Sequence, residues 1–106
     1  MTYLENTMDK IINKKLYEFE AEIKKVSDID AAYIEFPYDI KKEFGKGRVK
    51  VHIEFDGEPY DGSIVNMGVK YSDNSICYII GIRKDIRKKI KKQAGDKIKV
   101  KIQERE

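Results

Sequence analysis

The feature that most constrains this chain is a pattern that occurs twice in the same order. An apolar, Tyr-containing run leads into a short charged segment, a glycine and an alternating strand, first over residues 32–55 and again over 76–102. The charged segments 39–44 and 85–90 share their apolar positions and nearly share their charges. Fixed-order self-similarity is typical of a structure built from two like units. The sequence therefore predicts an internal duplication, although strand–helix–strand patterns are common enough to match by chance.

Length and composition indicate one small globular domain. The 106 residues leave room for one modest core, and the chain is 39% charged and 41% apolar. No apolar run approaches the roughly 20 residues that a membrane-spanning helix needs. A single cysteine, Cys77, in an apolar run predicts a buried structural thiol in a reducing compartment. With no signal-peptide pattern at the N-terminus, we expect a cytoplasmic location.

Hydrophobic alternation predicts five or six short strands. The segments are 17–24, 32–36, 49–55, 60–65, 76–80 and 98–102. Residues 17–24 and 49–55 alternate strictly between apolar and polar side chains, as a strand with one buried face does. Pro37 ends the second segment, and Asp56-Gly57 is a strong hairpin signal. Gly62 predicts a bulge or close packing within its strand.

Helical signals are short. Asp39 suits a helix N-cap, with the helix ending at Phe44 before Gly45. A second, basic helix carries apolar residues four apart at Ile82, Ile86 and Ile90. Residues 1–14 predict an N-terminal helical extension, because Leu4, Met8, Ile11 and Ile12 form an apolar stripe. The predicted organisation is therefore a helical extension, 1–14, and a single β-barrel domain, 15–106.

The predicted fold class is mainly β. Several short strands with two helical turns favour a small barrel over an open sheet, because closure removes unpaired strand edges. The barrel would contain about six strands from two pseudo-repeats, with two short helices and the N-terminal helix.

The placed motifs resemble a bacterial family classed as a domain of unknown function, which precedes a bacteriocin-protection (OmpD-associated) segment in longer relatives. The resemblance runs from about Tyr17 to Ile102. It is carried by 17–21, Phe36-Pro37, Phe44-Gly45, 49–51 leading to Asp56-Gly57, Gly68, 82–88 and 95–100. It implies a double-split β-barrel made from two like halves. The pattern over 82–100 is also similar to the strand–helix–strand unit of AbrB-type swapped-hairpin proteins. The family offers no established catalytic or binding residues to transfer.

Signs of catalysis are missing from the sequence. It contains no nucleophile elbow, no His/Cys set with metal-ligand spacing and no phosphate-binding glycine loop. His52, the one histidine, faces away from the apolar side of its strand and is expected to be exposed or paired across strands. We therefore expect no enzyme, no metal and no cofactor.

The first functional hypothesis is a binding module for a small anionic or acyl ligand. Tyr60, Tyr71 and Tyr78 lie near predicted strand ends, and Arg83 and Arg87 follow closely. Aromatic faces with a fixed guanidinium can hold such a ligand. The alternative is that the tyrosines simply fill the core with their hydroxyls reaching water.

The second hypothesis is nucleic-acid binding by the basic helix. Residues 1–82 hold 11 Lys/Arg and 15 Asp/Glu, a net −4, whereas residues 83–106 hold 11 and 4, a net +7. Clustered cations neutralise phosphates, but they also occur on solvated helix faces and guarded strand edges. The candidate residues are Arg83, Lys84, Arg87, Lys88, Lys91 and Lys92.

A third hypothesis is a partner-protein module, in which another chain supplies the segment that longer relatives carry covalently. The stripe of Leu4, Met8 and Ile12 is then the expected contact, or the means of forming a homodimer. The sequence leaves monomer and homodimer open.

Overall fold

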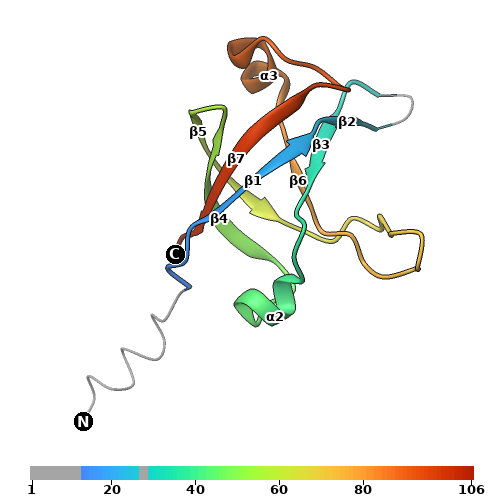
Figure 1. Ribbon diagram of the computed structural model, residues 1–106, viewed down its shortest axis with the longest axis vertical. Helices are drawn as coiled ribbons and strands as arrows, with labels where there is room; N and C mark the ends of the chain where they lie inside the picture. The colour runs from blue at the N-terminus through green and yellow to red at the C-terminus, as the bar shows by residue number, and fades with distance from the viewer. Residues whose placement is uncertain (1–12, 27–28) are drawn as a thin grey trace.

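The computed structural model describes residues 13–26 and 29–106, which form two antiparallel sheets and two short helices (Figure 1). The strands are β1 (Tyr17–Glu22), β2 (Lys24–Lys25), β3 (Ala32–Glu35), β4 (Val49–Phe55), β5 (Glu58–Ile64), β6 (Ile79–Gly81) and β7 (Lys97–Glu104). The helices are α2 (Ile40–Phe44) and α3 (Lys84–Ile90). A mainly β fold is thus confirmed.

The two sheets are connected on both sides. One contains four strands in the order β1-β7-β4-β5, and the other three in the order β2-β3-β6. The chain passes from β1 to β2 through the buried Ile23, whose N–H donates to Asp96 O at 2.8 Å. On the other side, Val65 follows β5 and bridges to Ile79 in β6.

The turn and cap residues act as their chemistry predicts. Asp56 and Gly57 have φ values of 51° and 87°, the left-handed conformations that a tight β4–β5 hairpin requires. Asp39 caps α2 by accepting the N–H groups of Lys41 and Lys42, and Gly45 ends the helix in the left-handed region. Gly62 packs closely, since an added Cβ would lie 2.8 Å from Cε2 of Tyr60.

The second helix begins differently from the first. Asp85, which aligns with Asp39 in sequence, lies inside α3, and the N-cap is Arg83, which makes no side-chain cap bond. The helix ends on Lys91 with φ of 59°, where the first copy has Gly45. The two copies therefore agree at their helix ends but not at their helix starts.

Strand pairing relates the two copies. At the centre of the β4–β7 ladder, Ile53 pairs with Ile102. The pairs on either side are Val51–Glu104 and Phe55–Val100. Since β4 and β7 are the closing strands of the two copies, this ladder joins equivalent elements antiparallel to each other. The β3–β6 ladder likewise joins the opening strands of the two copies, with Ile34 opposite Ile80.

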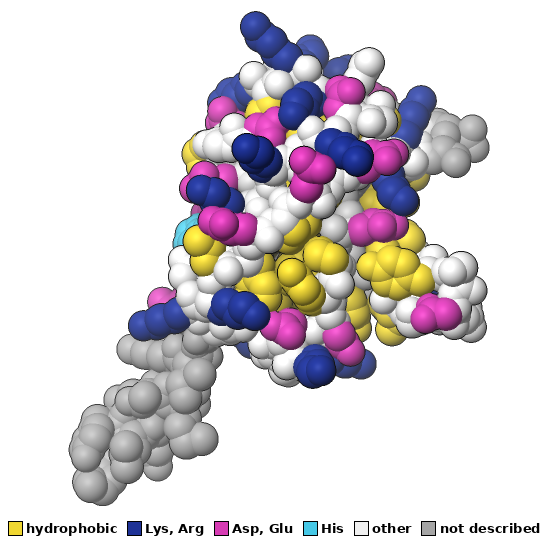
Figure 2. All heavy atoms as spheres, in the orientation of Figure 1, with side chains coloured by type: hydrophobic (Ala, Val, Ile, Leu, Met, Phe, Trp, Pro, Cys, Tyr) yellow, Lys and Arg dark blue, Asp and Glu magenta, His cyan; other side chains and the backbone are white. Residues whose placement is uncertain are grey.

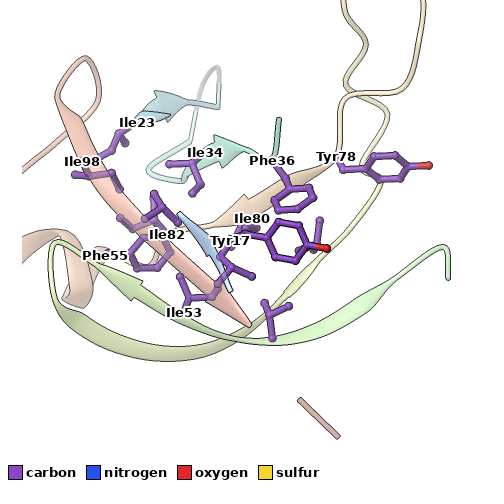
Figure 3. Packing of buried hydrophobic residues seen from close by; sticks show 14 of the residues in the cluster. Tyr17, Ile23, Ile34, Phe36, Ile53, Phe55, Tyr78, Ile80, Ile82 and Ile98 are labelled. Carbon is purple, nitrogen blue, oxygen red and sulfur yellow. The ribbon is translucent and has the colours of Figure 1, made fainter. Parts of the chain in front are cut away.

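One core lies between the sheets (Figure 3). Apolar side chains from every strand except β2, and from both helices, are buried in it or packed against it. In β4 the burial alternates strictly, with Val49, Val51, Ile53 and Phe55 inside. Cys77 is also buried, as expected.

The sequence-predicted elements differ from the structure mainly at their ends. The segment predicted as a strand over 76–80 forms β6 only at 79–81. Residues 76–78 instead pair with the preceding loop and with Phe36, through Cys77 N–H to Val69 O and Phe36 N–H to Tyr78 O, both at 2.9 Å. The predicted helix over residues 1–14 lies almost wholly outside the described residues.

Candidate functional site

Two of the three predicted ligand-binding tyrosines line one surface groove. The groove has a volume of about 400 Å³ and lies between the start of α2 and the loop that joins β5 to β6. Its lining residues are Pro37, Tyr38, Asp39, Lys41, Tyr71, Ser75, Ile76 and Tyr78. We call it the tyrosine groove. Its volume falls within the range of small-molecule sites.

Tyr38, which sequence reasoning missed, provides a fixed aromatic wall. It is 45% exposed, yet its ring contacts Tyr17, Phe19 and Phe36 at centroid distances of 5.7, 6.5 and 5.4 Å. The contacts with Phe19 and Phe36 are edge-to-face and the one with Tyr17 is tilted, and aromatic pairs of these kinds stabilise the position of the ring. The position directly after Phe36-Pro37, at the mouth of an aromatic cluster, is the sequence signal that could have identified it.

Apolar surface is concentrated near this groove. Three large apolar side chains that line it are each at least 38% exposed: Tyr38, Tyr71 and Ile76. Figure 2 shows hydrophobic side chains gathered between β1 and α2 and again on the loop between β5 and β6. Tyr78 is buried, but Figure 3 shows its hydroxyl pointing away from the core. The groove therefore offers aromatic faces and an outward hydroxyl.

The hydroxyl of Tyr71 has a raised pKa. Burial raises the pKa of Tyr71 to about 12, with further contributions from the neighbouring Cys77 thiol and the carboxylates of Glu35 and Asp73. Burial also raises the pKa of the Cys77 thiol. Tyr71 consequently stays protonated at neutral pH and presents its ring rather than a charge.

The charged groups of the groove are few. Asp39 uses one carboxylate oxygen to cap α2, accepting from Lys41 N–H at 3.0 Å. Ser75 donates its hydroxyl to Asp73 at 2.6 Å, which brings a second carboxylate next to the groove. Lys41 is exposed and, among the described residues, forms no ion pair.

The other predicted ligand-binding residues lie elsewhere. Tyr60 packs against Phe55, with ring centroids 6.2 Å apart, and lines a separate depression beside β7. Arg83 is the N-cap of α3 and Arg87 lies within that helix. Helix α3 is at the opposite end of the molecule from α2 (Figure 1). The structure therefore does not bring the tyrosines and the arginines together.

A second groove gathers most of the predicted nucleic-acid-binding residues. It has a volume of about 320 Å³ and is lined by Lys84, Arg87, Lys88, Lys91, Lys92, Gln93 and Asp96. We call it the basic groove. It includes five of the six predicted cations, and Arg83 is the one outside it.

Most of these cations already have acidic partners. Lys84 and Arg87 contact Asp30 at 3.1 and 3.3 Å, and their hydrogen bonds hold the pKa of that carboxyl below its usual value. Lys92 Nζ lies 2.6 Å from Asp56 and 2.7 Å from Lys97 O.

Arg83 Nε contacts Asp85 at 3.1 Å. Within the described part of the chain, Lys88 and Lys91 form no ion pair. These two ammonium groups are therefore the ones available to an anion without competition from an acidic side chain.

His52 forms an exposed cross-strand pair. Its Nδ1 lies 2.6 Å from Asp61 Oδ1, and the two residues face each other in the β4–β5 ladder. Both side chains are about 60% exposed. This is the expected structural role for the histidine.

Two further features concern metals and membranes. Across residues 13–26 and 29–106, no group of three or more His, Cys, Asp or Glu side chains is arranged to hold a metal ion. In the same residues, no helix has the length and apolar character to cross a bilayer.

Comparison with known sequences assigns the domain to a family. No curated protein matches the chain. A family described as a domain of unknown function, DUF1905, matches residues 19–102, which include all but the first two residues of β1 and the last two of β7. The matched region contains both grooves in full, from Pro37 to Asp96. The chain therefore belongs to the DUF1905 family of domains of unknown function.

Proposed function

We propose that this domain is a non-catalytic binding module and that the tyrosine groove is its site for a small molecule with an apolar or aromatic body. The observation that carries the proposal is Tyr38, which is 45% exposed although three aromatic contacts fix its ring. A rigid aromatic wall loses little conformational entropy on binding. Fixed aromatic surface that remains open is typical of ligand sites.

The corresponding region of the second half supports this choice. A shift of 46 residues relates Tyr38 to Lys84 and Lys41 to Arg87. There, Lys84 and Arg87 bind Asp30 in the turn between β2 and β3, so ion pairs join the helix to the neighbouring turn. At the tyrosine groove, the start of α2 and the loop between β5 and β6 contribute aromatic side chains in place of these ion pairs.

A thermal-shift screen against a metabolite library tests the proposal. We expect at least one compound to raise the melting temperature of the wild type, and Tyr71→Ser to abolish that shift. Met67→Ser is the matched control, because Met67 is 70% exposed on the same loop but does not line the groove. The proposal fails if a broad library gives no stabilising compound, or if every shift survives in Tyr71→Ser.

Nucleic-acid binding is the second candidate, favoured by the convergence of five cations on the basic groove. The acidic partners of Lys84, Arg87 and Lys92 weaken it. Fluorescence anisotropy with a duplex at low salt would test it, with Lys88→Gln/Lys91→Gln compared against Lys14→Gln/Lys50→Gln. Loss of two phosphate contacts should lower the salt slope by about two. No anisotropy change at micromolar protein would remove this candidate.

We also infer that the two sheets form a double-split β-barrel made from two like halves. The pairing of equivalent strands, β4 with β7 and β3 with β6, supports the duplication. The Val65–Ile79 bridge and the passage from β1 to β2 support closure. The free, buried Cys77 supports our proposal of a cytoplasmic setting.

A further inference from the structure

The geometry points to an organic ammonium ion, carried on an apolar body, as the ligand class of the tyrosine groove. This inference rests on the proposed function, since it concerns the same groove. It differs from the sequence-based expectation of an anionic or acyl ligand, which depended on Arg83 and Arg87. Those arginines lie at α3, away from the tyrosines.

The first argument is the ring content of the groove. Tyr38, Tyr71 and Tyr78 contribute to its lining, and the rings of Tyr38 and Tyr71 are 45% and 39% exposed. The face of an aromatic ring carries partial negative charge and attracts cations, quaternary ammonium groups in particular. Tyr71 also keeps its proton at neutral pH, so its ring remains an ordinary neutral cation acceptor.

The second argument is the placement of carboxylates. Asp39 lines the groove, and its carboxylate accepts only the backbone N–H groups that it caps. Among the described residues it forms no ion pair. Asp73 is held beside the groove by the N–H and hydroxyl of Ser75, at 3.0 and 2.6 Å. The carboxylates of Asp73 and Glu35 both contribute to the raised pKa of Tyr71, so negative charge lies near its hydroxyl, with Glu35 also paired with Lys24 at 3.3 Å.

Lys41 is the charge that opposes this inference. It lines the groove, but its ammonium is on a flexible four-carbon stem and its side chain is exposed. Such a group can turn toward water, whereas Asp39 is held by its bonds to the backbone of α2. We therefore expect Lys41→Gln to strengthen the binding of a cation.

The test compares two probes that differ in charge and share a shape. Choline and 3,3-dimethylbutan-1-ol are titrated into ¹⁵N-labelled protein, with benzyltrimethylammonium as a larger cation and benzoate as an anion. We expect the cations to shift the amides of residues 38–41 and 71–78, and choline to bind at least about threefold more tightly than its neutral isostere. Benzyltrimethylammonium should bind more tightly than choline, because its ring adds apolar contact.

Variants separate charge from structure. Asp39→Asn keeps a good N-cap while removing the charge, so it should weaken both cations severalfold and leave 3,3-dimethylbutan-1-ol unchanged. Asp85→Asn, in the first turn of α3 and paired with Arg83, is the matched control. Tyr71→Phe should retain binding and Tyr71→Leu should lose it, because the ring face is what the cation contacts.

The possible outcomes distinguish this inference from the proposed function. If the neutral alcohol binds the groove as tightly as choline, the charge preference is wrong while the binding site stands. If benzoate binds there more tightly than the cations and Lys41→Gln abolishes it, the ligand class is anionic. If none of the four probes shifts groove amides but the thermal-shift screen finds another groove ligand, the ammonium inference alone falls. If both experiments are negative, both proposals fall.

Discussion

Truncation of Ile102 is the most informative perturbation of the core. Ile102 is fully buried at the centre of the four-stranded sheet, where it pairs with Tyr17 on one side and Ile53 on the other. It also lies at the midpoint of the β4–β7 ladder, which joins the two halves. A cavity at this point is therefore surrounded by both halves of the domain.

The expected loss in the free energy of unfolding follows from the complete burial of the Ile102 side chain. Ile102→Val should lower the free energy of unfolding by about 1 kcal/mol, and Ile102→Ala by about 4 kcal/mol, in the upper part of the usual range. The upper part applies because the strands on both sides hold the site open and limit its collapse. A loss of about 4 kcal/mol is a large share of the total stability of a domain of this size.

Urea denaturation followed by circular dichroism measures these values, and the m-value should stay constant across the series. Lys101→Ala is the control, since Lys101 lies next to Ile102 on β7 and its side chain is 53% exposed. It should change stability by less than about 0.5 kcal/mol. The reasoning is refuted if Ile102→Ala costs less than about 1 kcal/mol, or no more than Ile102→Val.

Three further predictions follow from the caps and the titrating groups. Asp39→Ala should lower the free energy of unfolding by about 1 kcal/mol, because α2 loses its cap, while Asp39→Asn should be nearly neutral; equal losses in urea melts would contradict the cap. For Asp56, burial alone would raise the pKa, but hydrogen bonds from Lys92 and the Lys99 N–H lower it on balance. This group therefore stabilises the fold above its unfolded pKa and stops doing so as the pH falls through its folded pKa. Wild type and Asp56→Asn should thus differ at pH 6 and converge once the pH is below that folded pKa; a constant difference across an acid titration would be inconsistent with the ion pair. For Tyr17, burial and the hydrogen bond to Glu43 raise the pKa from 10.0 to about 12, so stability should fall as the pH rises between these values. Tyr17→Phe should make that decline shallower by about 1.4 kcal/mol per pH unit, and an unchanged slope would rule out this role for the hydroxyl.

Local chemistry explains why much of the fold was predictable. The alternation of β4, the cap at Asp39 and the Asp56-Gly57 turn each depend on residues close together in sequence. The start of α3 was harder to predict, because Asp85 resembles a cap in isolation. Arg83 instead takes the N-cap position with φ of −64° and ψ of 152°.

The site was predictable only in part, because it depends on which loops meet. Tyr71 and Tyr78 were identified as candidates from their positions at strand ends, and they do share a groove. Tyr38 follows Pro37, far away in sequence, and it reaches the same groove because Phe36 N–H bonds to Tyr78 O at 2.9 Å. Arg83 and Arg87 follow β6 closely in sequence, but β6 leads away from the groove to α3 at the other end of the molecule (Figure 1).

The most direct test of the central claim is an intermolecular NOE measurement with benzyltrimethylammonium at saturating concentration. The account predicts NOEs from the ligand's methyl protons to the ring protons of both Tyr38 and Tyr71. NOEs to side chains of α3, or none to either tyrosine ring while the ligand is bound, would contradict it.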